Sequence, residues 1–392
     1  MSKPYLVFNR RTELIDFSKI RVYSALATKI PGAIDLTLGE PDFDTPRHIR
    51  SAARDAIEQG FTHYTPTAGI PELRAAISRK LQRENGITAD PNSQVLVSVG
   101  ASEGIMLTMQ GLLNEGDEVL VPDPGFDMYV PNILLAGGKP VPLPLAEPEF
   151  NIDEDVLRSL VTSKTKMVVL NSPSNPTGAI LDRKETKKVL DVALENELYV
   201  VSDEVYEAVL YDGVGHFSPA SSSECFPRCV SLYSFSKTYA MTGWRVGYVV
   251  APAELTTKFT KLHRNIVAHP TSISQRAALA ALTGSQECVG EMVREFDRRR
   301  LFMLSRLEEL GIPCSRPRGA FYLFPNVLRF GEHSATTAKE LAQRGVVTVP
   351  GSAFGPSGEG HLRISYAASM SGLKQAMEIL ASWVERKGSG TS

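Results

Sequence analysis

Short apolar runs alternate with amphipathic stretches through the middle of the chain. Runs typical of strands buried on both faces occur at 95–99, 118–122, 167–171, 198–202, 229–233 and 247–251. Stretches with helical periodicity, such as 102–113 and 183–195, lie between several of them. Strands that alternate with helices predict an α/β fold with a mostly parallel sheet flanked by helices. We assign this large domain to residues 45–285.

The periodicity changes after Gly284. Apolar residues recur at helical spacing from Val289 to Leu310, which predicts one long amphipathic helix that links two domains. Strand-like segments follow at 320–324, 346–349 and 362–366. Helical stretches at 335–344 and 371–387 are interleaved with them. The segments after Gly284 therefore predict a smaller α+β domain. We expect it to be built from both chain ends, residues 1–44 and 286–392.

Composition narrows the classes of partner. The chain of 392 residues has 42 Lys and Arg against 44 Asp and Glu, so no basic surface for nucleic acid or anionic lipid is expected. No apolar run is long enough to span a membrane, and the N-terminus lacks a signal-peptide pattern. We therefore predict a cytoplasmic protein. The four cysteines show no paired-ligand spacing and predict neither a disulfide nor a metal site: Cys225, Cys229, Cys288 and Cys314.

The segment 231–247, SLYSFSKTYAMTGWRVG, carries the strongest chemical signal. Lys237 stands at the strand-to-loop edge of an apolar run, with Ser234 and Ser236 before it and Arg245 after it. A lysine amine can condense with an aldehyde, and hydroxyls together with a bidentate arginine can hold a phosphate. Pyridoxal phosphate carries both groups, so it is the expected cofactor, with Lys237 as its covalent anchor and as the catalytic base.

A carboxylate should accompany this lysine, because the pyridine nitrogen of the cofactor withdraws electrons only when it is protonated. Asp203 ends the buried run 198–202 and is predicted to hold that proton. Glu204 is the competing acid. Alternation along a strand should turn Glu204 away from the face that carries Asp203.

Two anion sites are expected. The strand at 95–99 ends at Gly100, where a helix should begin and where backbone N–H groups of Ala101 and Ser102 would favour the cofactor phosphate. Ser102 is expected both to cap the helix and to contact the phosphate. Arg363 lies inside the apolar segment 362–366, where a charge is costly unless it faces a site. We expect its planar guanidinium to bind the α-carboxylate of a substrate.

Together with Asn171-Ser-Pro-Ser-Asn-Pro-Thr-Gly178, these motifs resemble the class I aspartate/aromatic aminotransferase family of fold-type I pyridoxal-phosphate enzymes, from about Ile34 to about Leu380. The resemblance implies a PLP-dependent transferase fold and further contacts. Asn175 and Tyr206 would meet the phenolic oxygen of the cofactor, and Asn175 also the substrate carboxylate. Phe126 would stack on the pyridine ring, and the backbone of Gly39 would lie against the substrate.

The resemblance also implies a homodimer with shared active sites. Thr62-His-Tyr-Thr-Pro-Thr-Ala-Gly69 is similar to an interface segment in which a tyrosine, here Tyr64, reaches the phosphate bound by the neighbouring subunit. The implied reaction moves an amino group between an amino acid and a 2-oxo acid, with 2-oxoglutarate as acceptor, by a ping-pong cycle. A carbon–sulfur β-lyase with the same site is the alternative.

Two positions bear on the preferred amino acid. Prokaryotic-type aspartate aminotransferases carry a lysine in the loop where this chain has Ser102, which favours aromatic or neutral side chains here. Arg264 is a candidate for contacting a distal carboxylate across a dimer interface, although an ordinary exposed arginine is an equal alternative. The effector-binding half of a transcriptional regulator would need a helix-turn-helix domain, for which residues 1–44 leave no room.

Overall fold

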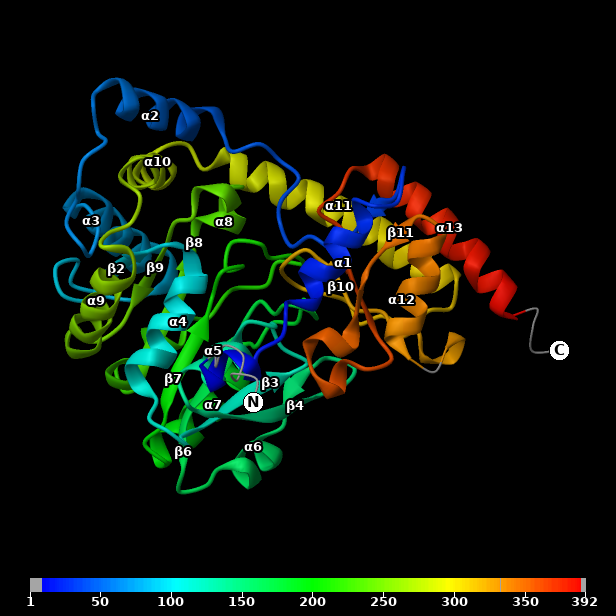
Figure 1. Cartoon of the computed structure of the whole chain (residues 1–392), viewed down its shortest axis with the longest axis horizontal. Helices are drawn as coiled ribbons and strands as arrows, with labels where there is room; N and C mark the ends of the chain where they lie inside the picture. Colours follow the sequence, from blue (N-terminus) through cyan, green and yellow to red (C-terminus); the bar gives the residue numbers. More distant parts are fainter. Residues whose placement is uncertain (1–8, 332, 389–392) are drawn as a thin grey trace, which may run out of the picture.

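The centre of the fold is an eight-stranded sheet (Figure 1), seen in a computed structural model that describes residues 9–331 and 333–388. The strand order is β2-β9-β8-β7-β6-β3-β4-β5, and neighbours from β8 to β4 are parallel. β9 is antiparallel to both of its neighbours, and β5 is antiparallel to β4. The strands are Val95–Ser98 (β2), Glu118–Asp123 (β3), Lys139–Ala146 (β4), Asn151–Ile152 (β5), Thr165–Asn171 (β6), Tyr199–Asp203 (β7), Cys229–Ser234 (β8) and Gly247–Val250 (β9).

Both faces of this sheet are covered by helices, which confirms the predicted α/β architecture. Alternate strand residues such as Val168 and Val169 belong to different apolar cores, because successive side chains of a strand point to opposite faces. One core is closed by α4 (Gly100–Leu112), α5 (Tyr129–Leu135) and α9 (Ala253–Val267). The other is closed by α2 (Arg47–Glu58), α3 (Pro71–Lys80), α6 (Glu154–Leu160), α7 (Arg183–Glu195) and α10 (Ser272–Thr283).

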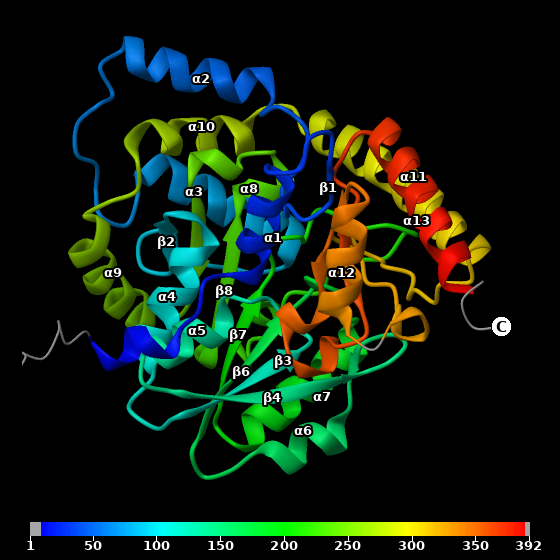
Figure 2. The ribbon, with the colours of Figure 1, turned by 45° about the vertical axis from the view of Figure 1, so that its right-hand side comes forward.

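A third core lies beyond the large sheet, at the right of Figures 1 and 2. The long helix predicted after Gly284 is α11 (Glu287–Glu309), which packs along α13 (Met370–Gly388). A three-stranded sheet has β13 (Leu362–Ser365) between β10 (Tyr322–Leu323) and β12 (Val349–Pro350), and α12 (Ser334–Gln343) contacts β12. α1 (Lys19–Ala27) contacts β11 (Val346–Val347) and β12.

Residues 34–36 pair with segments of the C-terminal part of the chain. β1 (Ile34–Asp35) is parallel to β11, and the Ser365 N–H donates to the Leu36 carbonyl at 2.9 Å. The boundaries at 44/45 and 285/286 remain a prediction, and residues 1–8, 332 and 389–392 lie outside the described chain. The predicted strand 346–349 is instead two short strands in different sheets, and only Tyr322–Leu323 of 320–324 is strand.

The ends of several strands of the large sheet meet at one edge. Ser98, Gly247 and Ser234 are in register across β2, β9 and β8, while Asp203 of β7 lies between Asn171 of β6 and Leu232 of β8. Carboxyl ends of parallel strands are the usual place for a site in this class of fold. In the described part of the chain, no helix is both long and apolar enough to cross a membrane.

Candidate active site

Lys237 lies in a single helical turn that follows β8. This turn, α8 (Phe235–Thr238), is capped by Ser234, whose Oγ accepts from the Ser236 N–H at 3.1 Å. The predicted strand-to-loop position is therefore wrong in detail, because the serine cap starts a helix at the strand end. The Lys237 Nζ donates to the carbonyl oxygen of Gly39. Burial lowers the pKa of Lys237 to about 8, which makes a neutral amine available near physiological pH.

Asp203 is the last residue of β7 and is only 2% exposed. The hydroxyl of Tyr129 donates to its Oδ2 at 2.7 Å, and the Val205 N–H donates to its Oδ1 at 3.4 Å. Burial raises the pKa of Asp203 to about 6, and these two hydrogen bonds oppose the rise only partly. An acid in this state gains most from a nearby cation, such as a protonated ring nitrogen.

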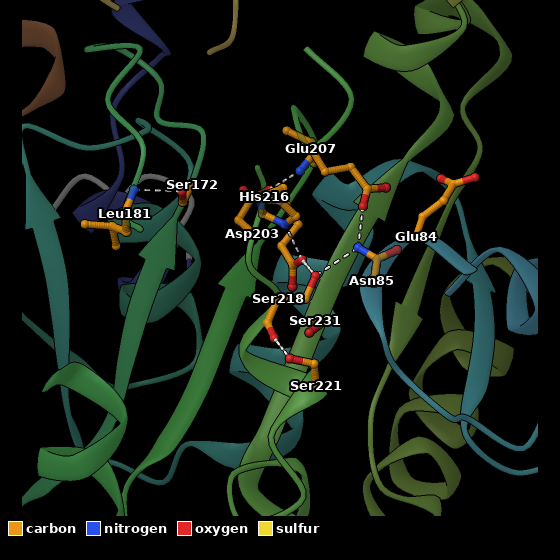
Figure 3. Close-up of polar contacts among 12 residues, drawn as sticks. Glu84, Asn85, Ser172, Leu181, Asp203, Glu207, His216, Ser218, Ser221 and Ser231 are labelled. Carbon is orange, nitrogen blue, oxygen red and sulfur yellow. Dashed lines mark hydrogen bonds and ion pairs between the residues drawn. The ribbon is translucent and has the colours of Figure 1, made fainter. Parts of the chain in front are cut away.

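Glu204 follows directly but belongs to a separate polar cluster. Its Oε2 lies 2.7 Å from His216 Nε2 and accepts a hydrogen bond from Ser218. Figure 3 shows the other end of this cluster, where Asn85 Nδ2 donates to Glu207 at 2.6 Å and to Ser218 Oγ at 2.8 Å. Glu204 thus faces away from the partners of Asp203, as strand alternation predicts.

Donor atoms of this second cluster are close enough to suggest a metal ion. One ligand atom from each of Glu204, Glu207 and His216 lies within 4.8 Å of the others. However, Lys80 Nζ already donates to Glu207, and the contact between His216 and Glu204 is a hydrogen bond. The lysine and the histidine already balance the two carboxylates, so these four side chains form a hydrogen-bonded ion network.

The expected phosphate cradle brings three segments together. Gly100 has φ +73°, and a Cβ there would lie 2.7 Å from Arg245 Nη2, so the guanidinium lies against the start of α4. A Cβ on Gly247 would meet the Ala101 nitrogen at 2.9 Å. Arg245 itself has the left-handed φ of +51°, and its Nη1 donates to the Thr242 carbonyl at 2.8 Å. The helix N-terminus, the arginine and the end of β8 therefore face one small volume.

Ser102 does not cap α4, contrary to the prediction. The helix begins at Gly100, and Ser102 lies in its first turn. Glycine tolerates a positive φ, so the chain can pass directly from β2 into the helix. Glu103 takes the capping contact instead, because its Oε2 accepts from the Val99 N–H at 2.5 Å. Ala101 and Ser102 remain partly exposed beside the cradle.

Arg363 is a buried cation in the middle strand of the three-stranded sheet, 1% exposed. Its Nη1 donates to Asn175 Oδ1 at 3.1 Å, and its Nη2 donates to the Thr37 carbonyl. The guanidinium carbon lies 4.6 Å from the ring centroid of Tyr322 and 5.0 Å from that of Phe354. Across residues 9–331 and 333–388 no carboxylate pairs with it, and its Nε is buried without a partner. Such a guanidinium is suited to a carboxylate ligand.

The other predicted contacts divide into two groups. Tyr206 is buried, and its hydroxyl lies 2.6 Å from that of Tyr322. Tyr322 in turn lies against Gly39 and against Arg363, which donates to Asn175. Phe126 is half-buried, with its ring edge-on to Tyr129 at a centroid distance of 5.8 Å. In contrast, Tyr64 is 89% exposed and packs edge-on against His269. Arg264 is exposed on α9.

Sequence reasoning missed the residues that hold the chemical groups in place. Tyr129, Tyr322 and Thr37 contact Asp203, Tyr206 and Arg363 respectively. Their contacts span distant segments, so spacing in the sequence carries no sign of them. Tyr129 and Thr37 had a weak signal, because they lie within three residues of the predicted site residues Phe126 and Gly39 respectively.

Known proteins resemble this chain over almost its whole length. Residues 31–380 match the family described as aminotransferase class I and II. An aspartate aminotransferase from Pyrococcus abyssi is 44% identical, with 95% of this chain and 97% of that protein covered. An aromatic-amino-acid aminotransferase from Thermococcus litoralis is 42% identical, with 97% and 99% covered.

A solved structure agrees with these relatives. Aspartate aminotransferase from Thermus thermophilus with maleate is 37% identical, covers 96% of this chain and 100% of its own, and superposes with a TM-score of 0.93. The relatives carry aminotransferase names, so the β-lyase alternative is not favoured. The chain therefore belongs to the class I and II aminotransferase family, in its aspartate/aromatic branch, and is a pyridoxal-phosphate-dependent aminotransferase.

Proposed function

We propose that this enzyme transfers the amino group of an amino acid with an aromatic or other neutral side chain to a 2-oxo acid, with 2-oxoglutarate as acceptor, in a ping-pong cycle. The observation that carries the proposal is the partly neutral amine of Lys237, close to the buried acid Asp203 and the unpaired Arg363. These are the base, the proton holder and the carboxylate anchor that transamination requires.

The residues fit pyridoxal phosphate as a bound group. A phosphate suits the start of α4 beside Arg245, because free N–H groups, the helix dipole and a guanidinium all favour an anion. The roles proposed for Ser234, Ser236, Ala101 and Ser102 are hydrogen bonds to that phosphate. Those of Tyr206, Asn175 and Phe126 are contacts to the ring and its oxygen.

Each residue contributes a distinct step. The cofactor, when bound, accepts the electrons left by the broken Cα–H bond. Lys237 takes the proton from the substrate Cα and delivers it back to the reacting groups. Asp203, positioned by Tyr129, keeps a proton on the ring nitrogen. Arg363 orients the substrate carboxylate, with Asn175 and the Gly39 backbone beside it.

The decisive test uses Lys237→Ala. This variant should lose turnover completely, and borohydride should no longer link the cofactor to the chain, as measured by mass. The matched control is Lys187→Ala, because Lys187 is an exposed lysine on α7 that pairs with Asp191. A Lys237→Ala protein that transaminates at near the wild-type rate would refute the proposal.

The two anion sites are separable by mutation. Arg363→Lys keeps the charge but loses the fork, so it should raise KM for the amino acid and the 2-oxo acid with little change in cofactor affinity. Arg245→Ala should weaken cofactor binding instead, measured by dialysis. An exchange of these two effects would mean that the sites are assigned the wrong way round.

We further infer a cytoplasmic homodimer in which Tyr64 contacts the phosphate of the neighbouring subunit. The exposure of Tyr64, far above that of the other tyrosines proposed for the site, supports this inference. Mixing inactive Tyr64→Ala with inactive Lys237→Ala protein should restore activity, because each hybrid dimer contains one intact site. Hybrids confirmed by mass that show no activity above the two parents would exclude the shared site.

A further inference from the structure

Asp123 is a buried acid to which the proposed chemistry gives no role. It is 5% exposed and is the last residue of β3. Its Oδ2 accepts from the hydroxyl of Ser357 at 2.9 Å, and its Oδ1 accepts from the Ser357 N–H at 3.1 Å. Ser357 belongs to the loop of residues 351–358, which precedes β13. Asp123 therefore ties the large sheet to the part of the chain that carries Arg363.

A second contact lies beside this one. The Gly125 N–H donates to the Phe354 carbonyl at 2.8 Å. Gly355 has φ +124°, and a Cβ there would lie 2.1 Å from Asp123 Oδ1. The carboxylate thus lies directly against the backbone of the loop, at a position that needs glycine for its conformation and for its lack of a side chain. Asp123 and Gly125 together hold this side of the loop.

The two ends of the loop are held to each other. The Gly351 N–H donates to the His361 carbonyl at 2.7 Å. A Cβ on Gly351 would lie 1.9 Å from the Gly358 carbonyl oxygen, so the two glycine backbones are in contact. A short loop with closed ends is a compact unit. A contact made at Ser357 therefore also restrains Phe354.

Phe354 connects the loop to the substrate arginine. Its side chain is buried, and its ring centroid lies 5.0 Å from the guanidinium carbon of Arg363. The loop also starts directly after β12, where Val349 is in register with Arg363. A guanidinium binds a carboxylate through two parallel hydrogen bonds in its own plane. The ring that flanks Arg363 therefore helps to decide in which direction this plane faces.

We propose that Asp123 is a positioning residue for the α-carboxylate site: through Ser357 and the loop, it holds the ring of Phe354 against Arg363. This inference rests on the proposed function, because it assumes that Arg363 binds the α-carboxylate. The amino acid and the 2-oxo acid have that group in common. Asp123 should therefore act on both substrates alike, whatever their side chains.

The test measures the binding of 3-phenylpropionate to the holoenzyme. This acid has one carboxylate and no amino group, so calorimetry reports binding without turnover. Asp123→Ala should raise its Kd about tenfold, because both hydrogen bonds from Ser357 are lost. KM for the amino acid and for the 2-oxo acid should rise by a similar factor, with kcat changed less than about threefold. The rate at which the cofactor dissociates should stay the same.

Asp90→Ala is the matched control. Asp90 accepts from the same two kinds of donor, the Asn92 N–H at 3.0 Å and the Ser93 hydroxyl at 2.5 Å. It does so at an exposed position before β2, away from the loop of residues 351–358. This variant should leave Kd, KM and kcat unchanged.

Two milder variants keep the proposal testable should Asp123→Ala fail to fold. Asp123→Asn keeps one oxygen acceptor, and Ser357→Ala keeps the backbone donor, so each should raise Kd about threefold. A double variant tests the route of the effect. Combined with Arg363→Lys, Asp123→Ala should weaken binding little further, because its effect passes through the guanidinium.

Three results would overturn the role of Asp123 alone. The first is an unchanged Kd in the Asp123 variants while Arg363→Lys weakens binding. The second is faster loss of the cofactor with unchanged KM, which would mean that Asp123 supports Phe126 instead. The third is an undiminished effect in the double variant. An unchanged Kd in Arg363→Lys would instead contradict the proposed function, since Arg363 would not be the carboxylate anchor, and the role of Asp123 would fall with it.

Discussion

Asp203 and Glu204 are neighbours in the chain, but their carboxylates have opposite surroundings. Asp203 is buried with one hydroxyl donor and one long backbone contact, and its pKa is raised to about 6. Burial also disfavours ionisation of Glu204, but hydrogen bonds from His216 and Ser218 and the charge of His216 outweigh it and lower the pKa. Successive side chains along a strand point to opposite faces of the sheet, and Asp203 and Glu204 accordingly have different partners at the end of β7.

The difference separates a group that does chemistry from one that holds structure. Glu204 has its partners within the protein, so its charge is already compensated. Among the described residues no cation forms an ion pair with Asp203, although the charge of Lys237 acts on it, and a ligand that carries a positive charge would supply a direct partner. Under-compensated acids in a cleft are characteristic of functional sites. The proposed role of Asp203 is therefore the one that its surroundings leave open.

The largest expected effect comes from removing Asp203. Asp203→Asn should lower kcat by three powers of ten or more, a loss on the order of 4 kcal/mol in transition-state stabilisation, because the ring nitrogen loses its proton holder. Glu204→Gln should retain kcat within a few fold per folded holoenzyme. Steady-state kinetics on both variants, with cofactor occupancy measured, decides between them. The comparison is wrong if Glu204→Gln is the damaging change.

For the free energy of unfolding, in contrast to kcat, we expect the substitution of Glu204 to be the damaging one. Glu204→Gln leaves His216 buried beside a neutral group, and breaking a buried ion pair typically costs about 3 kcal/mol. Chemical unfolding at fixed protein concentration measures this loss. Glu115→Gln is the control, because Glu115 pairs with Arg11 at the surface and such pairs contribute at most about 1 kcal/mol. Equal losses in both variants would contradict the structural role of Glu204.

The pH dependence of the cofactor-free protein should separate the two acids further. A carboxyl whose folded pKa is raised ionises first in the unfolded chain, so Asp203 makes stability fall as pH rises from about 4 to about 6, by roughly 2–3 kcal/mol. Asp203→Asn should remove this fall. Thermal unfolding of both proteins across this range tests it, and parallel curves would refute the raised pKa.

Glu204 and His216 should also make the free energy of unfolding depend on pH, each in its own direction. The lowered pKa of Glu204 means that its stabilisation is present above its ordinary pKa and is lost as pH falls. Burial lowers the pKa of His216, but the bond and charge of Glu204 raise it overall. The stabilisation from His216 is therefore present below its ordinary pKa and is lost as pH rises through the raised value. The same unfolding curves on Glu204→Gln should lose both slopes.

The smallest expected effect comes from Tyr129→Phe. This change removes the hydroxyl that donates to Asp203 and leaves the carboxyl in place, so kcat should fall about tenfold, as expected for one hydrogen bond to a charged group. Steady-state kinetics with saturating cofactor measures it. A loss as large as that of Asp203→Asn would mean that Tyr129 takes part in the chemistry directly.

Several site residues could be predicted from sequence because local features mark them. Asp203 and Arg363 stand at the end of or inside an apolar strand and Lys237 closely follows one, at places where a polar group needs a reason to be present. The α/β sheet followed from the alternation of buried strands and helices. The capping role of Ser102 was predicted wrongly, because α4 begins at Gly100 itself through a positive φ, which the sequence Gly-Ala-Ser does not reveal.

The features of the fold and of the site that could not be predicted depend on contacts between distant segments. The split of 346–349 into two strands depends on which partner each half meets, β1 for one and β13 for the other. The Thr37 carbonyl and the Tyr322 ring reach Arg363 only after the chain ends have packed together. Pairing of this kind is decided by the whole fold.

The fixed guanidinium of Arg363 has a practical consequence for the choice of buffer. Its two hydrogen bonds and two flanking rings hold it ready before any ligand arrives. A receptor that is already ordered loses little freedom on binding, so even small carboxylates gain from it. We therefore expect acetate and formate to compete with the amino acid. Kinetic constants for this enzyme should be measured in buffers free of carboxylic acids.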